Sequence, residues 1–148
     1  MIVQTTHDHI DEILMIERSS FNRPWSMTHF TNDINRTDIS YNYVYIGDNK
    51  TVLAFLFGYK IIDEYHLNNI AVNPDFRRRK IGSNMLNYLI DQMTKLCVQT
   101  IKLEVSARNE AAIHLYKSKG FYPVGIRNDY YSKGDDAILF SMEMKSNG

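Results

Sequence analysis

Apolar residues recur at spacings of three and four along four segments, and this pattern predicts four helices. The first begins at a cap on Asp8 and extends to Phe21, and the second begins after a cap on Ser26. The fourth is capped by Asn109 and stops at Gly120. The third and longest helix carries the apolar residues Met85, Leu86, Leu89, Ile90, Met93 and Leu96.

Runs rich in β-branched and aromatic residues predict the strands. They lie at 2–3, 41–46, 52–62, 65–72, 99–105, 121–130 and 137–144. The turn Asp48-Asn49-Lys50 joins the second and third strands into a hairpin, and Pro74 ends the fourth because it cannot donate to a ladder. Helices interspersed among strands predict an α/β domain with a mixed central sheet flanked by helices.

Composition narrows the class of protein. The 148 residues are the usual size of one domain, and no linker-like stretch divides them, so we expect one domain over 1–148. Seventeen Lys and Arg balance seventeen Asp and Glu, so no overall basic field favours nucleic acid or an anionic membrane. We expect a monomer without direct nucleic-acid or membrane contacts.

Cysteine usage and the N-terminus indicate the compartment. The single Cys97 excludes an internal disulfide and suits a reducing cytoplasm. No secretory leader or membrane-length apolar stretch is evident, so we expect a cytoplasmic protein. The five histidines are scattered apart from His7 and His9, so no metal is predicted.

The first segment with chemical potential is a basic run between the fourth strand and the long helix. It reads Arg77-Arg78-Arg79-Lys80-Ile81-Gly82-Ser83. A helix start offers unpaired N–H groups to a phosphate, and Gly82 lets a ligand approach the main chain closely. On charge alone a solvated basic turn is an equal alternative, but the position of the run favours a phosphate site.

The second segment contains Glu104 on a strand and Tyr116 on the following helix. Both side chains are expected to point into a shared gap, where a carboxylate and a phenol make an acid and base pair. The alternative interpretations are a surface glutamate, a packing aromatic and, for Asn109, a simple helix cap.

Taken together, these segments resemble the GCN5-related N-acetyltransferases (GNAT family) over almost the whole chain. The resemblance rests on NIAVNPDFRRRKIGSNML, LEV and NEAAIHLYKSKGF. It implies the GNAT fold, acetyl-CoA as co-substrate, a diphosphate at the basic turn, and the pantetheine and acetyl end near the LY segment. The cofactor-binding residues that it implies are Ile70, Ala71, Val72, Arg77, Arg78, Arg79, Lys80, Ile81, Gly82, Ser83, Asn109 and Tyr116.

Lys80 departs from the family pattern, which has glycine there. Either the turn tolerates lysine or the side chain faces a phosphate, and toleration is preferred because close approach is expected at Gly82. A positive φ at Lys80 would weaken the turn by about 1 kcal/mol or more.

Within this family, a further set of motifs resembles the bacterial ribosomal-protein-alanine acetyltransferases of the RimI type. This resemblance rests on FNRPWS, LNNIAV, the pair Glu104 with Tyr116, and RNDYY followed by DA. The resemblance implies direct acetyl transfer to the N-terminal alanine of ribosomal protein S18, with Glu104 as base and Tyr116 as acid. The alternative is a GNAT enzyme that acts on another protein N-terminus, a lysine or a small amine.

The remaining site predictions concern the acceptor and the reacting carbonyl. Trp25, Tyr130 and Tyr131 are candidates to line a peptide groove, although Trp25 serves equally well as a core anchor. The resemblance implies a backbone N–H near Val72 as the oxyanion donor. Cys97, the rival nucleophile, is expected to be a packed thiol.

Overall fold

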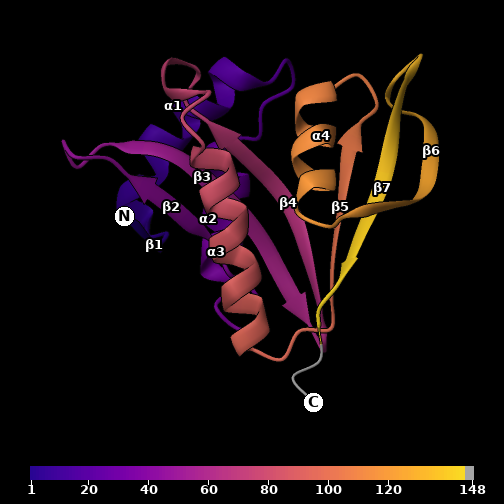
Figure 1. Ribbon diagram of the computed structural model, residues 1–148. Helices are drawn as coiled ribbons and strands as arrows, with labels where there is room; N and C mark the ends of the chain where they lie inside the picture. Colours follow the sequence, from indigo (N-terminus) through magenta and orange to yellow (C-terminus); the bar gives the residue numbers. More distant parts are fainter. Residues whose placement is uncertain (146–148) are drawn as a thin grey trace.

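The computed structural model describes residues 1–145, in which seven strands form one mixed sheet in the order β1-β2-β3-β4-β5-β7-β6 (Figure 1). The strands are β1 (Ile2–Gln4), β2 (Tyr43–Ile46), β3 (Val52–Ile61), β4 (Glu64–Val72), β5 (Thr100–Ser106), β6 (Tyr122–Ser132) and β7 (Asp135–Glu143). The helices are α1 (Ile10–Ser20), α2 (Met27–Asn35), α3 (Ile81–Lys95) and α4 (Glu110–Ser118), with 3-10 turns η1 (His7–His9) and η2 (Pro74–Phe76). The predicted α/β class and mixed central sheet are confirmed.

Local capping explains where α2, α4 and the 3-10 turn η1 begin. The predicted caps of α2 and α4 are confirmed, since the N–H groups of His29 and Ala112 donate to the Ser26 and Asn109 side chains, each at 3.1 Å. The cap at Asp8 was wrong. Asp8 lies inside η1, which is capped at Thr6, because Thr6 and His9 exchange hydrogen bonds and make the chain turn before α1 begins.

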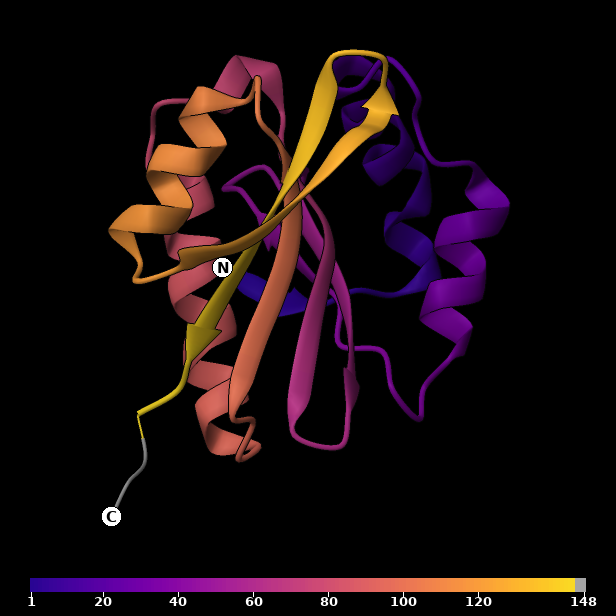
Figure 2. The same cartoon turned by 90° about the vertical axis from the view of Figure 1, so that its right-hand side faces the viewer.

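The helices cover the sheet in pairs, with α1 and α2 on one face and α3 and α4 on the other (Figure 2). Each pair has its own core. On the α3 face, Met85, Leu89 and Met93 pack on apolar side chains of the sheet. On the α1 face, Ile13 and Phe30 belong to a cluster with Phe55 and Phe57 of β3. The sheet is therefore buried on both sides, as its continuous apolar run in β3 requires.

A β-bulge in β4 decides which of its residues face which core. Phe57 pairs with Asn69, while the next residue, Gly58, pairs with Leu67, so Asn68 is an extra residue in β4. Before the bulge, Leu67 packs in the α3-side core, whereas after it Ala71 packs in the α1-side core. Because a one-residue insertion exchanges the two faces, Asn69 also turns toward α1.

The sheet divides between β4 and β5. These parallel strands pair only from Glu64 with Thr100 to Leu67 with Leu103. Further along, β4 pairs only with β3 and β5 only with β7, and the two strands diverge visibly in Figure 1. The rest of β4, as far as Val72, and the end of β5 therefore face a V-shaped split, where backbone groups lack a ladder partner.

Gly58 tests how tightly the bulge is packed. A Cβ at this position would overlap the Tyr65 hydroxyl oxygen and the His66 carbonyl oxygen, whereas one at Gly125 meets nothing within 4 Å. We expect Gly58→Ala to lower the free energy of unfolding by about 3 kcal/mol or more, and Gly125→Ala to change it by less than about 0.5 kcal/mol. Urea denaturation measures both, and equal small losses would contradict the packing described.

Candidate active site

The N-terminus of α3 lies where β4 reaches the split. Its first helical bond runs from the Asn84 N–H to the Lys80 carbonyl at 2.9 Å, and no side chain caps the helix. The N–H groups of Ile81, Gly82 and Ser83 are therefore free of helical partners, in contrast to the capped starts of α2 and α4. Together with the partial positive charge of the helix end, these groups make an anion-binding position.

Gly82 keeps the space beside this helix end open. A Cβ at position 82 would lie 3.4 Å from Leu115 Cδ2 on α4 and 3.7 Å from Val72 Cγ2 on β4. Any side chain longer than a methyl group would thus extend between the end of β4 and α4. This supports the predicted close approach of a ligand to the main chain at Gly82.

The cations of the turn differ in their surroundings. The Arg77 guanidinium donates from Nε to the Val72 carbonyl at 3.3 Å and from Nη2 to Ser20 Oγ at 3.2 Å, so it holds the turn against β4 and α1. The Arg79 guanidinium lies 5.1 Å from the centre of the Phe76 ring. All four cations are exposed on the side where α3 begins.

Lys80 adopts a backbone conformation that favours glycine, the residue that the family pattern has at this position. Its φ of 62° and ψ of 18° are left-handed, and Arg78 two residues earlier has a φ of 65°. A lysine pays a steric cost here that glycine does not. The turn thus places Lys80 at the positive φ for which a cost of about 1 kcal/mol or more was expected, while the preference for toleration over a phosphate contact stays a prediction.

Glu104 lies on β5 beside the split. Its neighbours Leu103 and Val105 are buried in the α3-side core, so its half-buried side chain points to the opposite face. There Oε1 forms an ion pair with Arg127 Nε at 3.3 Å. The guanidinium of Arg127 also lies 5.6 Å from the centre of the Tyr130 ring.

Tyr116 is buried on the α3 side of the sheet. Its ring makes an edge contact with Phe121 at 5.7 Å between centroids and a tilted one with Phe140 at 6.4 Å. Burial, with a smaller contribution from the nearby Tyr131, raises the pKa of the Tyr116 phenol well above its usual range. The phenol therefore keeps its proton throughout the physiological range.

Tyr131 on β6 connects these two residues electrostatically. Burial raises the pKa of Tyr131 to about 12, and the Glu104 carboxylate adds to the shift. Tyr131 in turn raises the pKa of Tyr116. Glu104 and Tyr116 make no direct hydrogen bond, so the expectation that they share one gap stays a prediction. Tyr131 is the residue that interacts electrostatically with both of them.

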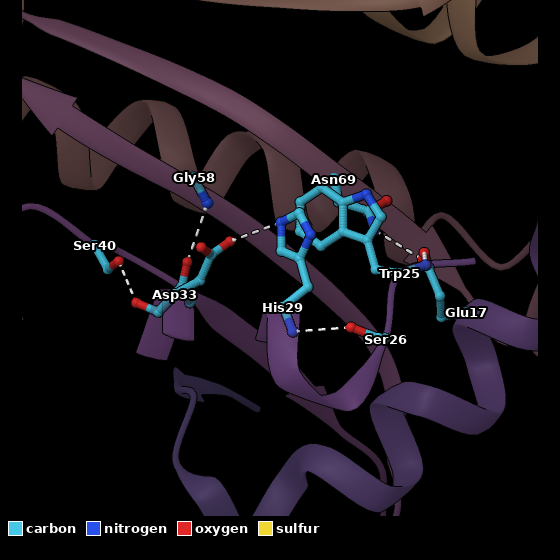
Figure 3. Close-up of polar contacts among 9 residues, drawn as sticks. Glu17, Trp25, Ser26, His29, Asp33, Ser40, Gly58 and Asn69 are labelled. Carbon is cyan, nitrogen blue, oxygen red and sulfur yellow. Dashed lines mark hydrogen bonds and ion pairs between the residues drawn. The ribbon is translucent and has the colours of Figure 1, made fainter. Parts of the chain in front are cut away.

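The α1–α2 loop carries Trp25 to the same end of the molecule. The Trp25 indole stacks on His29 with ring centroids 3.7 Å apart (Figure 3). Its centroid lies 5.3 Å from that of Phe30. It is half-buried against the α1-side core, as the core-anchor alternative requires. Tyr130 is 52% exposed and packs edge-on against Tyr131, so it is the freer of the predicted groove residues.

A buried carboxylate next to Trp25 was missed. Glu17 on α1 is 1% exposed. Its two carboxylate oxygens accept hydrogen bonds from the backbone N–H of Trp25 and from Asn69 Nδ2, each at 2.8 Å (Figure 3). Burial raises the pKa of Glu17, while both hydrogen bonds oppose the shift. A signal existed in the sequence, because Glu17 follows Ile10 and Ile13 on the apolar face of the helix, where a charged residue is unexpected.

Other candidates lie away from the split or have a different environment than expected. Cys97 is exposed rather than packed, because it follows the C-terminal end of α3 in a left-handed conformation, at the far end of that helix from Gly82. Residues 1–145 contain no cluster of three or more His, Cys, Asp or Glu side chains suited to hold a metal ion. None of the helices in this range is long and apolar enough to cross a bilayer.

One cavity of 350 Å³ lies beside α3, and a smaller one of 40 Å³ lies between β1 and the segment that follows α2. The larger is lined by Tyr43, Tyr88 and Gln92 among others. Neither includes a residue of the candidate site.

Comparison with known proteins agrees with this geometry. The model of the acetyltransferase (GNAT) family matches residues 10–121. The chain therefore belongs to the GNAT family of acetyltransferases, enzymes that take their acetyl group from acetyl-CoA, as its sequence motifs predicted.

Individual relatives are more specific. The chain is 37% identical over 130 residues to the ribosomal protein bS18-alanine N-acetyltransferase of Escherichia coli K12. The aligned region covers 86% of each protein. The crystal structure of the ribosomal-protein-S18-alanine N-acetyltransferase from Escherichia coli superposes with a TM-score of 0.91 at 32% identity, covering 100% of this chain and 96% of that one. An N-acetyltransferase from Staphylococcus aureus shares the fold with a TM-score of 0.83 at 19% identity, covering 98% of each chain.

Replacing Lys80 tests the strain in the turn. Because glycine adopts a positive φ freely, we expect Lys80→Gly to raise the free energy of unfolding by about 0.5–1 kcal/mol, after the greater flexibility of the unfolded chain is subtracted. Lys117→Gly, a matched change within α4, is expected to lower it by about 1 kcal/mol. Thermal denaturation of the two variants compares them, and equal losses in both would show that the turn is unstrained.

Proposed function

We propose that this chain transfers the acetyl group of acetyl-CoA to the N-terminal alanine of ribosomal protein bS18. The observation that carries the proposal is the 37% identity to the Escherichia coli bS18-alanine N-acetyltransferase over 86% of both chains. A ribosomal acceptor implies a cytoplasmic enzyme. We further propose that residues 1–145 form one domain, with the last three positions of the predicted range 1–148 lying outside the described residues, that the enzyme is a monomer, and that it contacts no nucleic acid or membrane directly.

The residues around the split fit the donor. The free N–H groups of Ile81, Gly82 and Ser83 suit the diphosphate, and the exposed Arg78, Arg79 and Lys80 suit the phosphates at its outer end. The unpaired edge of β4 at Ile70, Ala71 and Val72 suits the amide-bearing arm, which needs backbone partners. When bound, acetyl-CoA supplies a thioester carbonyl that an amine can attack.

Arg77 and Asn109 are proposed to support donor binding mainly by holding the turn and α4 in place. Arg77 holds the turn through Val72 and Ser20, and Asn109 caps α4 through the Ala112 N–H. Both therefore shape the binding surface, and any contact that they make with the donor is additional to these structural bonds.

The acceptor amine must lose a proton before it attacks. An α-amine has a reference pKa of about 8 and is largely protonated near pH 7. We propose Glu104 as the base, acting directly or through a water molecule, with Arg127 Nε at 3.3 Å orienting the carboxylate. The carboxylate is half-buried at the split, where an incoming ammonium can replace part of the ion pair.

The leaving thiolate needs a proton, and Tyr116 is proposed to donate it. Its raised pKa keeps the phenol protonated while the base works at neutral pH. A backbone N–H of the unpaired segment Ile70–Val72 is proposed to stabilise the charge that develops on the carbonyl oxygen. Transfer is then direct, and the exposed Cys97 at the far end of α3 takes no part.

An acetylation assay tests the substrate. We expect acetyl transfer to a peptide with the N-terminal sequence of bS18, and at least about 100-fold lower kcat/KM for the same peptide with a blocked N-terminus, for free lysine and for spermidine. Mass spectrometry locates the acetyl group. Equal transfer to lysine or spermidine would favour the alternative acceptors, and no transfer to the bS18 peptide would refute the assignment.

Two conservative variants test the proposed base and acid. Glu104→Gln and Tyr116→Phe are each expected to lower kcat by about 100-fold or more, with acetyl-CoA affinity retained. Because the Tyr116 pKa is raised, its acid form persists upward in pH, so wild-type kcat should show no alkaline fall below about pH 10 from this residue.

The matched controls are Glu143→Gln and Tyr122→Phe, two exposed residues of the same sheet that hydrogen-bond each other at 3.0 Å. Both are expected to retain kcat within about twofold. If the control and site variants lose the same activity, Glu104 and Tyr116 have no special chemical role.

A further inference from the structure

The segment 17–26, which comprises the C-terminal end of α1 and the loop before α2, connects the parts of the molecule that surround the split. Glu17 contacts Asn69 on β4, and Arg23 Nη1 donates to the Tyr131 carbonyl on β6 at 3.3 Å. Ser20 accepts from Arg77 in the turn before α3. The segment thus bonds to both halves of the sheet at the end where β4 and β5 no longer pair.

Glu17 is the most constrained of these contacts. A carboxylate that is 1% exposed costs free energy unless its lone pairs are used, and an apolar residue would fill the same position without that cost. Both oxygens of Glu17 receive donors, one from the backbone of the loop at Trp25 and one from the β4 residue just after the bulge. The carboxylate therefore fixes the loop backbone relative to the strand that lines the split.

The loop also carries residues toward β6. The half-buried Trp25 ring stacks on His29 of α2. Arg23 donates to the carbonyl of Tyr131, which is next to the exposed Tyr130. A displacement of the Trp25 backbone would move Arg23 away from β6 and widen the space between the loop and the tyrosines. The donor-binding turn is held by Arg77, which donates to the Val72 carbonyl and to Ser20 Oγ and makes no bond to Glu17.

We propose that Glu17 is a positioning residue that holds the loop 21–26 across the split and thereby sets the affinity for the acceptor peptide without affecting that for the donor. The inference rests on the proposed function and on the peptide groove predicted from the sequence, which Trp25 of this loop and Tyr130 and Tyr131 of β6 would line. It assigns Glu17 no contact with substrate. Its effect passes through the Trp25 backbone and Asn69.

Three variants separate positioning from simple stability. Glu17→Met keeps approximate volume but removes both acceptors, and we expect the KM for the bS18 peptide to rise about tenfold while the KM for acetyl-CoA changes less than about twofold. Glu17→Gln keeps one acceptor, and its amide can satisfy Asn69 if that side chain turns around, so it should restore most of the peptide affinity.

The matched control is Glu12→Met. Glu12 lies on the same helix and accepts the Val52 N–H at 2.7 Å, but at the other end of α1 from the split. We expect Glu12→Met to lower the melting temperature as Glu17→Met does, with both KM values unchanged. An unchanged peptide KM in Glu17→Met, or an equal rise in Glu12→Met, would overturn the proposal.

A second readout does not require the enzyme to act on bS18. Trp25 is the only tryptophan of the chain, so its fluorescence reports on the loop. Acrylamide should quench Trp25 more strongly in Glu17→Met than in wild type, Glu17→Gln or Glu12→Met. If the wild type does not acetylate the bS18 peptide, the proposed function fails, and equal quenching in all four proteins would separately refute the positioning role.

Discussion

The end of backbone pairing between β4 and β5 is the constraint on which the rest of this structure depends. Beyond Leu67 and Leu103 the two strands belong to separate halves of the sheet. Their inner edges carry hydrogen-bonding groups that must meet water or a ligand, because leaving them buried and unpaired would cost free energy. An extended, amide-bearing molecule that enters the split meets these groups as another strand would. The binding surface that we propose for the donor thus consists of strand edges that have no ladder partner.

The two halves need other connections at the open end, and the bulge at Asn68 allows one of them. By exchanging the faces of β4, it leaves Leu67 in the α3-side core and turns Asn69 toward Glu17 on α1. The same carboxylate holds the backbone of Trp25. Sheet register, helix packing and the placement of the loop are therefore set by the same few residues.

Local signals in the sequence predicted most of the fold. Ser26 and Asn109 were identifiable as caps because a cap and its partner lie within three residues of each other. The start of α1 was mispredicted for a related reason, since the mutual bonds of Thr6 and His9 compete with a cap at Asp8 and only the structure shows which wins. The positive φ of Lys80 was conditional on the turn geometry, which the residue type alone does not determine.

Contacts between distant residues were not predictable in this way. Glu17 and Asn69 are 52 residues apart, and Arg23 and Tyr131 are 108 apart. An unexpected glutamate on an apolar helix face reveals that a partner exists but not which residue it is. Likewise, the alternation along β5 predicted the face on which Glu104 lies, but only the fold shows that Arg127 lies beside it. Only the fold shows, too, that Tyr131 interacts electrostatically with both Glu104 and Tyr116.

A crystal structure of the complex with acetyl-CoA tests the central claim most directly. The account predicts diphosphate oxygens within hydrogen-bond distance of the N–H groups at the start of α3, the pantetheine arm along the free edge of β4, and the sulfur beside Tyr116 with Glu104 facing the acetyl carbon from the acceptor side. A donor bound elsewhere, with β4 and β5 hydrogen-bonded to each other beyond Leu67 and Leu103, would contradict it.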